Sequence, residues 1–247
     1  MIEVPAIAGP LTCGDAASFV VPDATFTNGE TGACEISGTV AGVIEENFTQ
    51  CGGTITITWT VEAEGNCDRP AVVASEVIEV IPAPEPIIIV PELSDLSCGE
   101  ADGFVAPDAT FSNGETGVCE ISGVVTPTIE NNFDECGGTI TITYSAPTGC
   151  DNNSVEEVIT INVAPAPEPV IEVPAIAGPL TCADAASFAA PDATFTNGET
   201  GVCEISGIVA GVIEENFTQC GGTITITWTV EAEGNCCLLY TSPSPRD

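Results

Sequence analysis

The sequence predicts an all-β fold built from tandem domains, and three features of the sequence carry this prediction. A unit with four cysteines recurs three times along the 247-residue chain, with a period of about 85 residues, which is typical of a domain array rather than a solenoid. Within each unit, apolar residues alternate with threonine, and no segment shows a sustained helical period. Glycine, asparagine and proline separate the alternating segments, as turns between strands require.

The cysteines define the repeating unit. Residues 2–67 align with residues 171–236 and differ only at positions 14, 20, 21, 33 and 39. We therefore expect repeat 1 at 1–82, repeat 2 at 87–165 and repeat 3 at 170–236. The linkers at 83–86 and 166–169 have alternating proline, which favours an extended polyproline II spacer. The cysteines of the three units are Cys13, Cys34, Cys51 and Cys67; Cys98, Cys119, Cys136 and Cys150; and Cys182, Cys203, Cys220 and Cys236.

The two ends of the chain predict a fragment of a longer protein. After Cys236 the similarity to repeat 1 stops, and residues 237–247 read like the translation of a sequencing adapter, so we expect Cys237 to be non-native. Met1 aligns with Val170, as it would if the chain began inside a gene. Repeat 3 would then lack its closing strand. Its neighbouring strand is expected to be an unpaired edge, and the repeat to be less stable than the other two.

The strands of repeat 1 can be assigned in chain order. We expect an opening strand at 2–4, a hairpin formed by 34–40 and 43–48, a central strand at 54–61 and a closing strand at 72–80. In the central strand, Ile55, Ile57, Trp59 and Val61 share one face and threonines the other. Trp59, like Trp228 in repeat 3, is therefore expected in the core rather than in a glycan site. Several short strands in about 80 residues fit a β-sandwich of immunoglobulin type.

Three even sets of four cysteines predict disulfides and an oxidising compartment. Zinc is disfavoured because the sets lack Cys-x-x-Cys spacing and the chain has no histidine. Pairing the third cysteine with the fourth is disfavoured because a long strand separates them. The hairpin favours Cys34–Cys51 with Cys13–Cys67, and pairing Cys13–Cys51 with Cys34–Cys67 is the alternative. The equivalents of the favoured pairs are Cys119–Cys136, Cys98–Cys150, Cys203–Cys220 and Cys182–Cys236.

Composition excludes several function classes. The net charge is −35, with two Lys or Arg residues in total and no histidine. Nucleic acid is excluded as a partner because phosphate binding needs basic residues, and anionic membranes are disfavoured for the same reason. No run of apolar residues is long enough for membrane insertion. We expect that the chain is not an enzyme, because it has no histidine to act as a base and no lysine to form a Schiff base. Carboxylate pairs are the remaining acid–base groups, and the sequence singles out no such pair.

Calcium is the one cofactor that the acidic surface suggests. The weak candidate ligands are exposed or junction carboxylates, namely Asp15, Asp23, Glu30, Glu85 and Glu168. Calcium takes six to eight oxygen ligands, and no EF-hand-like run is present. A solvated acidic surface is therefore the favoured interpretation, with no cofactor.

The Cys-Gly-Gly-Thr-Ile-Thr-Ile-Thr-Trp segment at 51–59, the cysteine after it and the Val-Ile-Glu-Val segment at 77–80 resemble HYR-like (hyalin-repeat-like) domains. The pattern is most similar to the four-cysteine variant found in tandem in surface proteins of Bacteroidetes-type bacteria, over residues 2–236. The resemblance implies an immunoglobulin-like fold and a secreted or cell-surface role in adhesion or as a stalk, without catalytic residues. Partners would be neighbouring repeats, with a surface protein or glycan bound by domains outside the chain. The alternative is that each repeat binds calcium or glycan.

Overall fold

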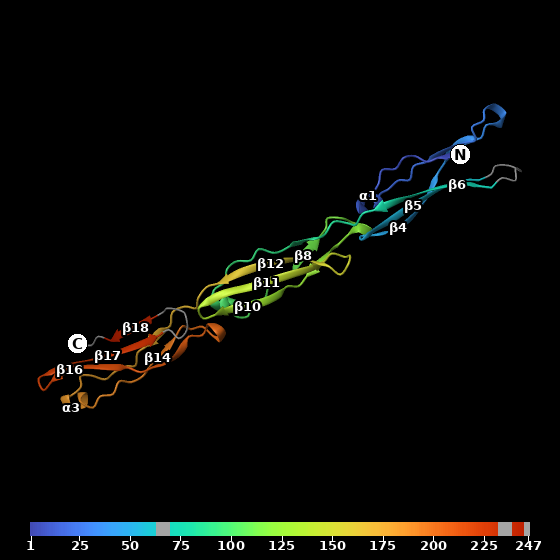
Figure 1. Cartoon of the computed structure of the whole chain (residues 1–247). Helices are drawn as coiled ribbons and strands as arrows, with labels where there is room; N and C mark the ends of the chain where they lie inside the picture. Colours follow the sequence, from blue (N-terminus) through green and yellow to red (C-terminus); the bar gives the residue numbers. More distant parts are fainter. Residues whose placement is uncertain (63–69, 232–238, 245–247) are drawn as a thin grey trace. The chain divides into compact units, whose positions relative to one another are not determined.

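The computed structural model of the chain (Figure 1) describes residues 1–62, 70–231 and 239–244. Its regular structure is mostly antiparallel strands with three short α-helices, so the predicted all-β class is confirmed. The elements of repeat 1 are β1 Ile2–Glu3, α1 Cys13–Ala17, β2 Ala24–Thr27, the 3₁₀-helix η1 Gly32–Cys34, β3 Ser37–Val40, β4 Gly42–Thr49, β5 Gly52–Val61 and β6 Val72–Val80.

Repeats 2 and 3 contain the same series of elements. In repeat 2 they are β7 Ile87–Ile89, α2 Cys98–Ala101, β8 Ala109–Ser112, η2 Gly117–Cys119, β9 Ser122–Val125, β10 Thr128–Asp134, β11 Gly137–Pro147 and β12 Ser154–Val163. In repeat 3 they are β13 Val170–Glu172, α3 Cys182–Ala185, β14 Ala193–Thr196, η3 Gly201–Cys203, β15 Ser206–Val209, β16 Val212–Thr218 and β17 Gly221–Glu231, and β18 Leu239–Ser244, in the segment after the repeat, stands in the closing-strand position.

Each repeat forms two three-stranded sheets whose strands follow chain order. In repeat 1 they are β1-β2-β3 and β4-β5-β6. The predicted hairpin of 34–40 with 43–48 is wrong, because β3 pairs with β2 and β4 pairs with β5. Strands β3 and β4 are adjacent in sequence but belong to different sheets. This simple order lacks the interleaved strands of an immunoglobulin domain, so the immunoglobulin-type connectivity is not confirmed.

The core of repeat 1 lies between its two sheets. Ile55, Ile57 and Trp59 on β5 are fully buried, in one cluster with Ala24 on β2. The Trp59 indole N–H donates to the Pro22 carbonyl oxygen at 3.1 Å. This burial confirms the alternation predicted from the sequence. Trp59 belongs to the core, because its ring is buried and its one polar group, the indole N–H, is hydrogen-bonded inside the repeat.

Tyr144 holds the equivalent position in repeat 2. It is fully buried, and its hydroxyl donates to the Pro107 carbonyl oxygen at 2.9 Å. Burial, together with the nearby Asp108 carboxylate, raises the pKa of Tyr144 because both disfavour the phenolate. Trp228 in repeat 3 donates to the Pro191 oxygen at 3.0 Å. One polar contact to a proline carbonyl thus recurs at the centre of all three cores.

Repeat 3 differs from the others at its third strand. Instead of an unpaired edge, β17 pairs with β18 from Ile226↔Ser244 to Glu231↔Leu239. The expectation of a wholly unpaired edge is therefore wrong, because the backbone groups of an edge strand can pair with any extended segment. In repeat 1, β6 covers β5 from Val61 back to Gly53. The pairing with β18 stops short of the part of β17 equivalent to Gly53–Thr56.

The chain forms two compact units that cut across the sequence repeats. Unit 1 comprises Met1–Pro91, Pro107–Pro127 and Tyr144–Glu157, and unit 2 comprises Glu92–Ala106, Thr128–Thr143 and Val158–Asp247. Unit 1 thus contains repeat 1 and one end of repeat 2. Unit 2 contains the other end of repeat 2 and repeat 3. Within repeat 2, strands β7, β8 and β9 belong to unit 1 and β10 belongs to unit 2, while β11 and β12 are divided between the two units.

Candidate functional site

The first element of the site is a short capped helix that begins with a cysteine. In repeat 1 the Thr12 hydroxyl oxygen accepts the Asp15 N–H at 3.1 Å, and the hydroxyl donates to the Asp15 carboxylate at 2.6 Å. Such an N-cap starts a helix at the next residue, which is Cys13. The side chain of Cys13 is 1% exposed.

The same helix start recurs in the other repeats. Ser97 and Glu100 form a capping box before Cys98. Hydrogen bonds from the Ser97 backbone N–H and from its hydroxyl lower the pKa of Glu100, because they favour the carboxylate. Thr181 caps α3, which begins at Cys182. We call the start of each of these helices, with its cysteine, the exit cysteine site of the repeat.

The second element is a loop that presents another cysteine. In repeat 2, the Asn113 side-chain oxygen accepts the N–H groups of Glu115 and Ile121, each at 3.1 Å, and its amide donates to the Cys119 carbonyl at 2.9 Å. Gly117 has a φ of +65°, a conformation that glycine adopts without strain. One asparagine side chain thus forms hydrogen bonds with both ends of the loop. We call the loop from this asparagine to the isoleucine the entry cysteine loop.

In unit 1 these two elements meet and are covalently joined. Cys13 forms a disulfide with Cys119 across 106 residues, with a Cα–Cα distance of 5.8 Å. Both sulfur-bearing side chains are buried, and Cys119 belongs to the core cluster of repeat 1. A second disulfide, Cys51–Cys150, has a Cα–Cα distance of 5.4 Å. Beside it the Gln50 amide donates to the Gly149 carbonyl at 3.4 Å.

Unit 2 contains the same junction between the next two repeats. Cys98 at the start of α2 bonds Cys203 in η3, again with a Cα–Cα distance of 5.8 Å. The packing around the bond recurs as well. A methyl group on Gly14 would meet the Glu115 carboxylate in unit 1, and one on Gly99 would meet the Glu199 carboxylate in unit 2. The exit cysteine site of one repeat therefore bonds the entry cysteine loop of the following repeat in both units.

The disulfides predicted within each repeat are wrong wherever the structure describes both partners. Cys13, Cys51 and Cys98 bond Cys119, Cys150 and Cys203, while Cys34, Cys182 and Cys220 are exposed free thiols. The reason is geometric. In repeat 2 the Cys98 sulfur lies 3.3 Å from the Asp134 carbonyl oxygen, just before β11, whereas Cys150 follows the far end of β11, whose eleven residues extend over about 35 Å, so the predicted pair cannot meet. Cys136 is also disulfide-bonded. Cys67 and Cys236, and hence their predicted pairs, lie outside the described residues.

The calcium candidates do not form a cluster. The side chains of Asp15, Asp23, Glu30, Glu85 and Glu168 are all exposed. Within the described ranges there is no group of three or more His, Cys, Asp or Glu residues placed to hold a metal ion. The Asp15 carboxylate instead accepts the Thr12 hydroxyl at the start of α1.

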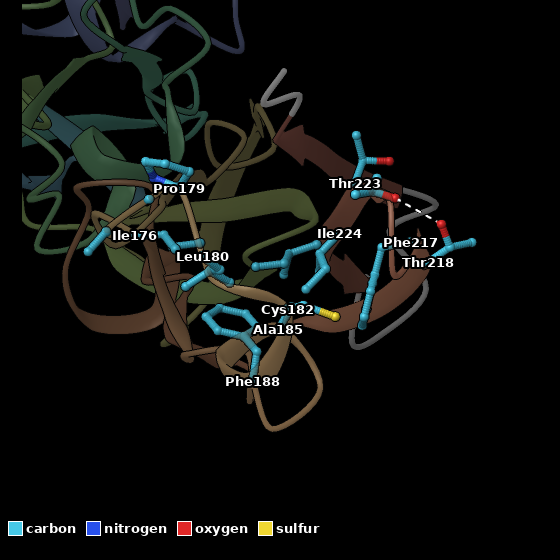
Figure 2. Close-up of a pocket in the computed structure, with 15 residues that line it drawn as sticks. Ile176, Pro179, Leu180, Cys182, Ala185, Phe188, Phe217, Thr218, Thr223 and Ile224 are labelled. Atoms are coloured by element: carbon cyan, nitrogen blue, oxygen red, sulfur yellow. Dashed lines mark hydrogen bonds between the residues drawn. The ribbon is translucent and has the colours of Figure 1, made fainter.

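One apolar cavity lies in repeat 3 (Figure 2). It has a volume of about 630 Å³ and is lined by Leu180, Cys182, Phe188, Phe217 and Ile224, among others. In repeat 1 the equivalent space is filled by the closing strand: a methyl group on Gly52 would lie 2.6 Å from the Val80 carbonyl oxygen, whereas one on Gly221 would meet nothing within 4 Å. The cavity thus corresponds to space that the end of the closing strand β6 fills in repeat 1.

Sequence reasoning missed the two elements that build the junction. The signals were present: Thr12-x-x-Asp15 and Ser97-x-x-Glu100 are capping patterns, and each entry loop reads Asn-Gly-Glu-Thr-Gly-x-Cys-Glu-Ile. What the sequence lacked was a reason to pair cysteines between repeats. No helix in the described part of the chain is long and apolar enough to cross a membrane.

Comparison of the chain with protein-family models, with curated proteins and with solved structures found no match. The resemblance to HYR-like repeats therefore remains a prediction from sequence.

Proposed function

We propose that this chain is a non-catalytic extracellular repeat array that acts as a disulfide-stabilised stalk or spacer in a large bacterial surface or secreted protein. The observation that carries this proposal is the bond between successive repeats, Cys13–Cys119 in unit 1 and Cys98–Cys203 in unit 2. A disulfide inside a domain stabilises only that domain, whereas a disulfide between domains also limits how far they can separate.

The same bonds support an extracellular setting. Disulfides persist in oxidising environments outside the cytosol. The net charge of −35 with two basic residues disfavours nucleic acid and anionic membranes as partners. In such an array the repeats serve as each other's partners. An adhesive or enzymatic activity would belong to other domains of the assembled protein.

The disulfides give a covalent path through the chain that is much shorter than the backbone. Under tension applied at both ends, this path runs from Met1 to Cys13, crosses to Cys119, returns to Cys98, crosses to Cys203 and continues to Asp247. Its backbone segments contain 12, 21 and 44 residues. At about 3.6 Å per residue the path extends to at most about 28 nm, compared with about 89 nm for the full chain.

Single-molecule force spectroscopy tests this proposal. The oxidised chain, held at its two termini, should stop extending at about 28 nm or less, and the same chain in a thiol reductant should reach about 89 nm. The stalk proposal fails if the oxidised chain extends as far as the reduced one, because the disulfides would then not connect successive repeats. A variant with Cys34→Ser and Cys182→Ser is the matched control, since it removes two free thiols and should extend like the unaltered oxidised chain.

A further inference from the structure

Repeat 1 and repeat 3 each carry an unused half of the disulfide junction. Cys34 occupies in repeat 1 the position of Cys119 and Cys203, and Cys182 occupies in repeat 3 the position of Cys13 and Cys98. Those four counterparts are bonded and at most 1% exposed, whereas Cys34 and Cys182 are free and exposed. The entry half in repeat 1 and the exit half in repeat 3 are therefore complementary to each other.

The entry loop of repeat 1 already has the conformation of a bonded loop. The Asn28 side-chain oxygen accepts the Glu30 and Ile36 N–H groups at 3.1 and 3.0 Å, and its amide donates to the Cys34 carbonyl at 2.7 Å. These are the contacts that Asn113 makes in repeat 2. The φ of Gly32 is +69°, compared with +65° at Gly117. Formation of a bond at Cys34 thus requires no reshaping of the loop.

The exit site of repeat 3 is prepared in the same way. The Thr181 hydroxyl oxygen accepts the Asp184 N–H at 3.2 Å and the hydroxyl donates to the Asp184 carboxylate at 2.6 Å, as Thr12 does with Asp15. Cys182 therefore lies at the first position of a capped helix, like Cys13. One nearby difference is Ala183 in place of Gly14 and Gly99. Its methyl group would meet a flexible glutamate carboxylate, which can move aside.

Apolar surface at the entry end is also left uncovered. Ile36 is 49% exposed, whereas its counterpart Ile121, at a formed junction, is 7% exposed. Covering this side chain would add a favourable apolar contact. The two free thiols and this exposed apolar surface are thus the features expected of an interface that has not yet bound its partner.

We propose that a second copy of this chain binds head to tail, with Cys182 of one copy bonded to Cys34 of the next. The contact continues the interface that joins repeats 1 and 2 and repeats 2 and 3. Because the two faces differ, the interface is heterologous and leads to open chains or rings of any number of copies. This proposal rests on the proposed stalk function, because it places between two chains the same type of disulfide junction that joins successive repeats within one chain.

The bond needs an oxidant, and a small-molecule disulfide such as oxidised glutathione supplies it. The thiolate of one cysteine attacks oxidised glutathione, forms a mixed disulfide and releases one glutathione thiol. The thiolate of the other cysteine then attacks the mixed disulfide and releases the second glutathione. Two thiols are oxidised to one protein disulfide, and one glutathione disulfide is reduced to two thiols.

The test is assembly of the full chain in a glutathione redox buffer, followed by non-reducing electrophoresis. The unaltered chain should give a ladder of multimers that collapses to monomer on reduction. Neither Cys34→Ser nor Cys182→Ser alone should form this linkage. An equal mixture of the two variants should form it once, giving a dimer and no longer species through this bond, because one variant supplies Cys182 and the other Cys34. Both residues are exposed, so the variants should fold like the parent.

Peptide mapping identifies the linkage and separates it from bonds formed by other thiols. Cleavage after glutamate releases Cys34 in peptide 31–35 and Cys182 in peptide 173–199, each with one cysteine. Ala33 distinguishes the first peptide by mass from its counterparts, which have Val118 and Val202. The expected dimer contains these two peptides joined. A monomeric wild-type chain, an absent dimer in the mixture, or dimers joined only through other cysteine pairs would each overturn the proposal.

The same digest keeps this proposal distinct from the stalk function. Peptides that join Cys98 with Cys203 report the junction inside the chain. If that bond is present and no intermolecular bond forms, only the head-to-tail assembly fails. If that bond is absent, the stalk function fails as well.

Discussion

Removing the Cys13–Cys119 disulfide by the double substitution Cys13→Ala and Cys119→Ala should strongly destabilise unit 1. The Cys51–Cys150 bond remains, so the unfolded chain still contains a cross-link. From Cys13 to Cys51 is 38 residues and from Cys119 to Cys150 is 31 residues. The lost bond therefore closed a loop of about 70 residues, whose closure entropy corresponds to about 4 kcal/mol. This is a large part of the stability of a small domain.

Urea denaturation followed by tryptophan fluorescence measures the loss. Trp59 is buried in repeat 1 and reports on unit 1, and Trp228→Phe removes the other tryptophan signal. With a slope of about 2 kcal/mol per molar urea, the midpoint should fall by about 2 M.

The matched control is Cys34→Ala with Cys182→Ala. These residues occupy the same positions in the repeat but are unbonded and exposed, so the change should stay within about 0.5 kcal/mol. Equal midpoints for the two double variants would refute the argument, because the loss would then not depend on the bond between repeats.

Three further predictions concern the core, the glycines and the charge. Tyr144→Phe should lower the free energy of unfolding by about 1 kcal/mol at neutral pH, measured in urea, because it removes the buried hydrogen bond of the hydroxyl. The raised pKa of Tyr144 means that the unfolded state loses its proton first, so the parent should also lose stability as the pH rises from about 10; a Phe variant with the same alkaline slope would contradict this. Gly42→Ala should cost about 1–3 kcal/mol in thermal unfolding, because the new methyl group would lie 2.8 Å from Ile57. Gly14→Ala is the control and should change the stability little, since its new methyl group would meet only the movable Glu115 carboxylate. Equal losses of stability in the two variants would show that the space around the new methyl group does not determine the effect. Finally, the melting temperature should rise between low salt and about 1 M salt as screening weakens the repulsion within a chain of net charge −35, and a flat response would show that this repulsion is unimportant.

The strands were predictable where the sequence alternates over a long stretch. The closing strand of repeat 1 has the predicted bounds, Val72–Val80, and the central strand is two residues longer than expected. Both signals are local, since a side chain on every second position reports its own burial. The four-residue strand β2 was missed because Ala-Thr-Phe-Thr is too short to show a period.

Strand partners and disulfide partners were harder to predict because they are properties of distant segments. Local sequence shows that a cysteine lies at the end of a strand, but not which other strand end lies beside it. The hairpin error had this origin: β3 and β4 are neighbours in sequence and still belong to different sheets. The disulfide error followed from it, because Cys34 and Cys51 flank two strands that do not pair.

The doubled bond at the first junction has a consequence for proteolysis. Among the described residues, repeats 1 and 2 are joined by the peptide segment at 83–86 and by the disulfides Cys13–Cys119 and Cys51–Cys150. A single cut in that segment leaves the two fragments attached to each other. Separating the two repeats at this segment therefore requires reduction of the disulfides as well as proteolysis.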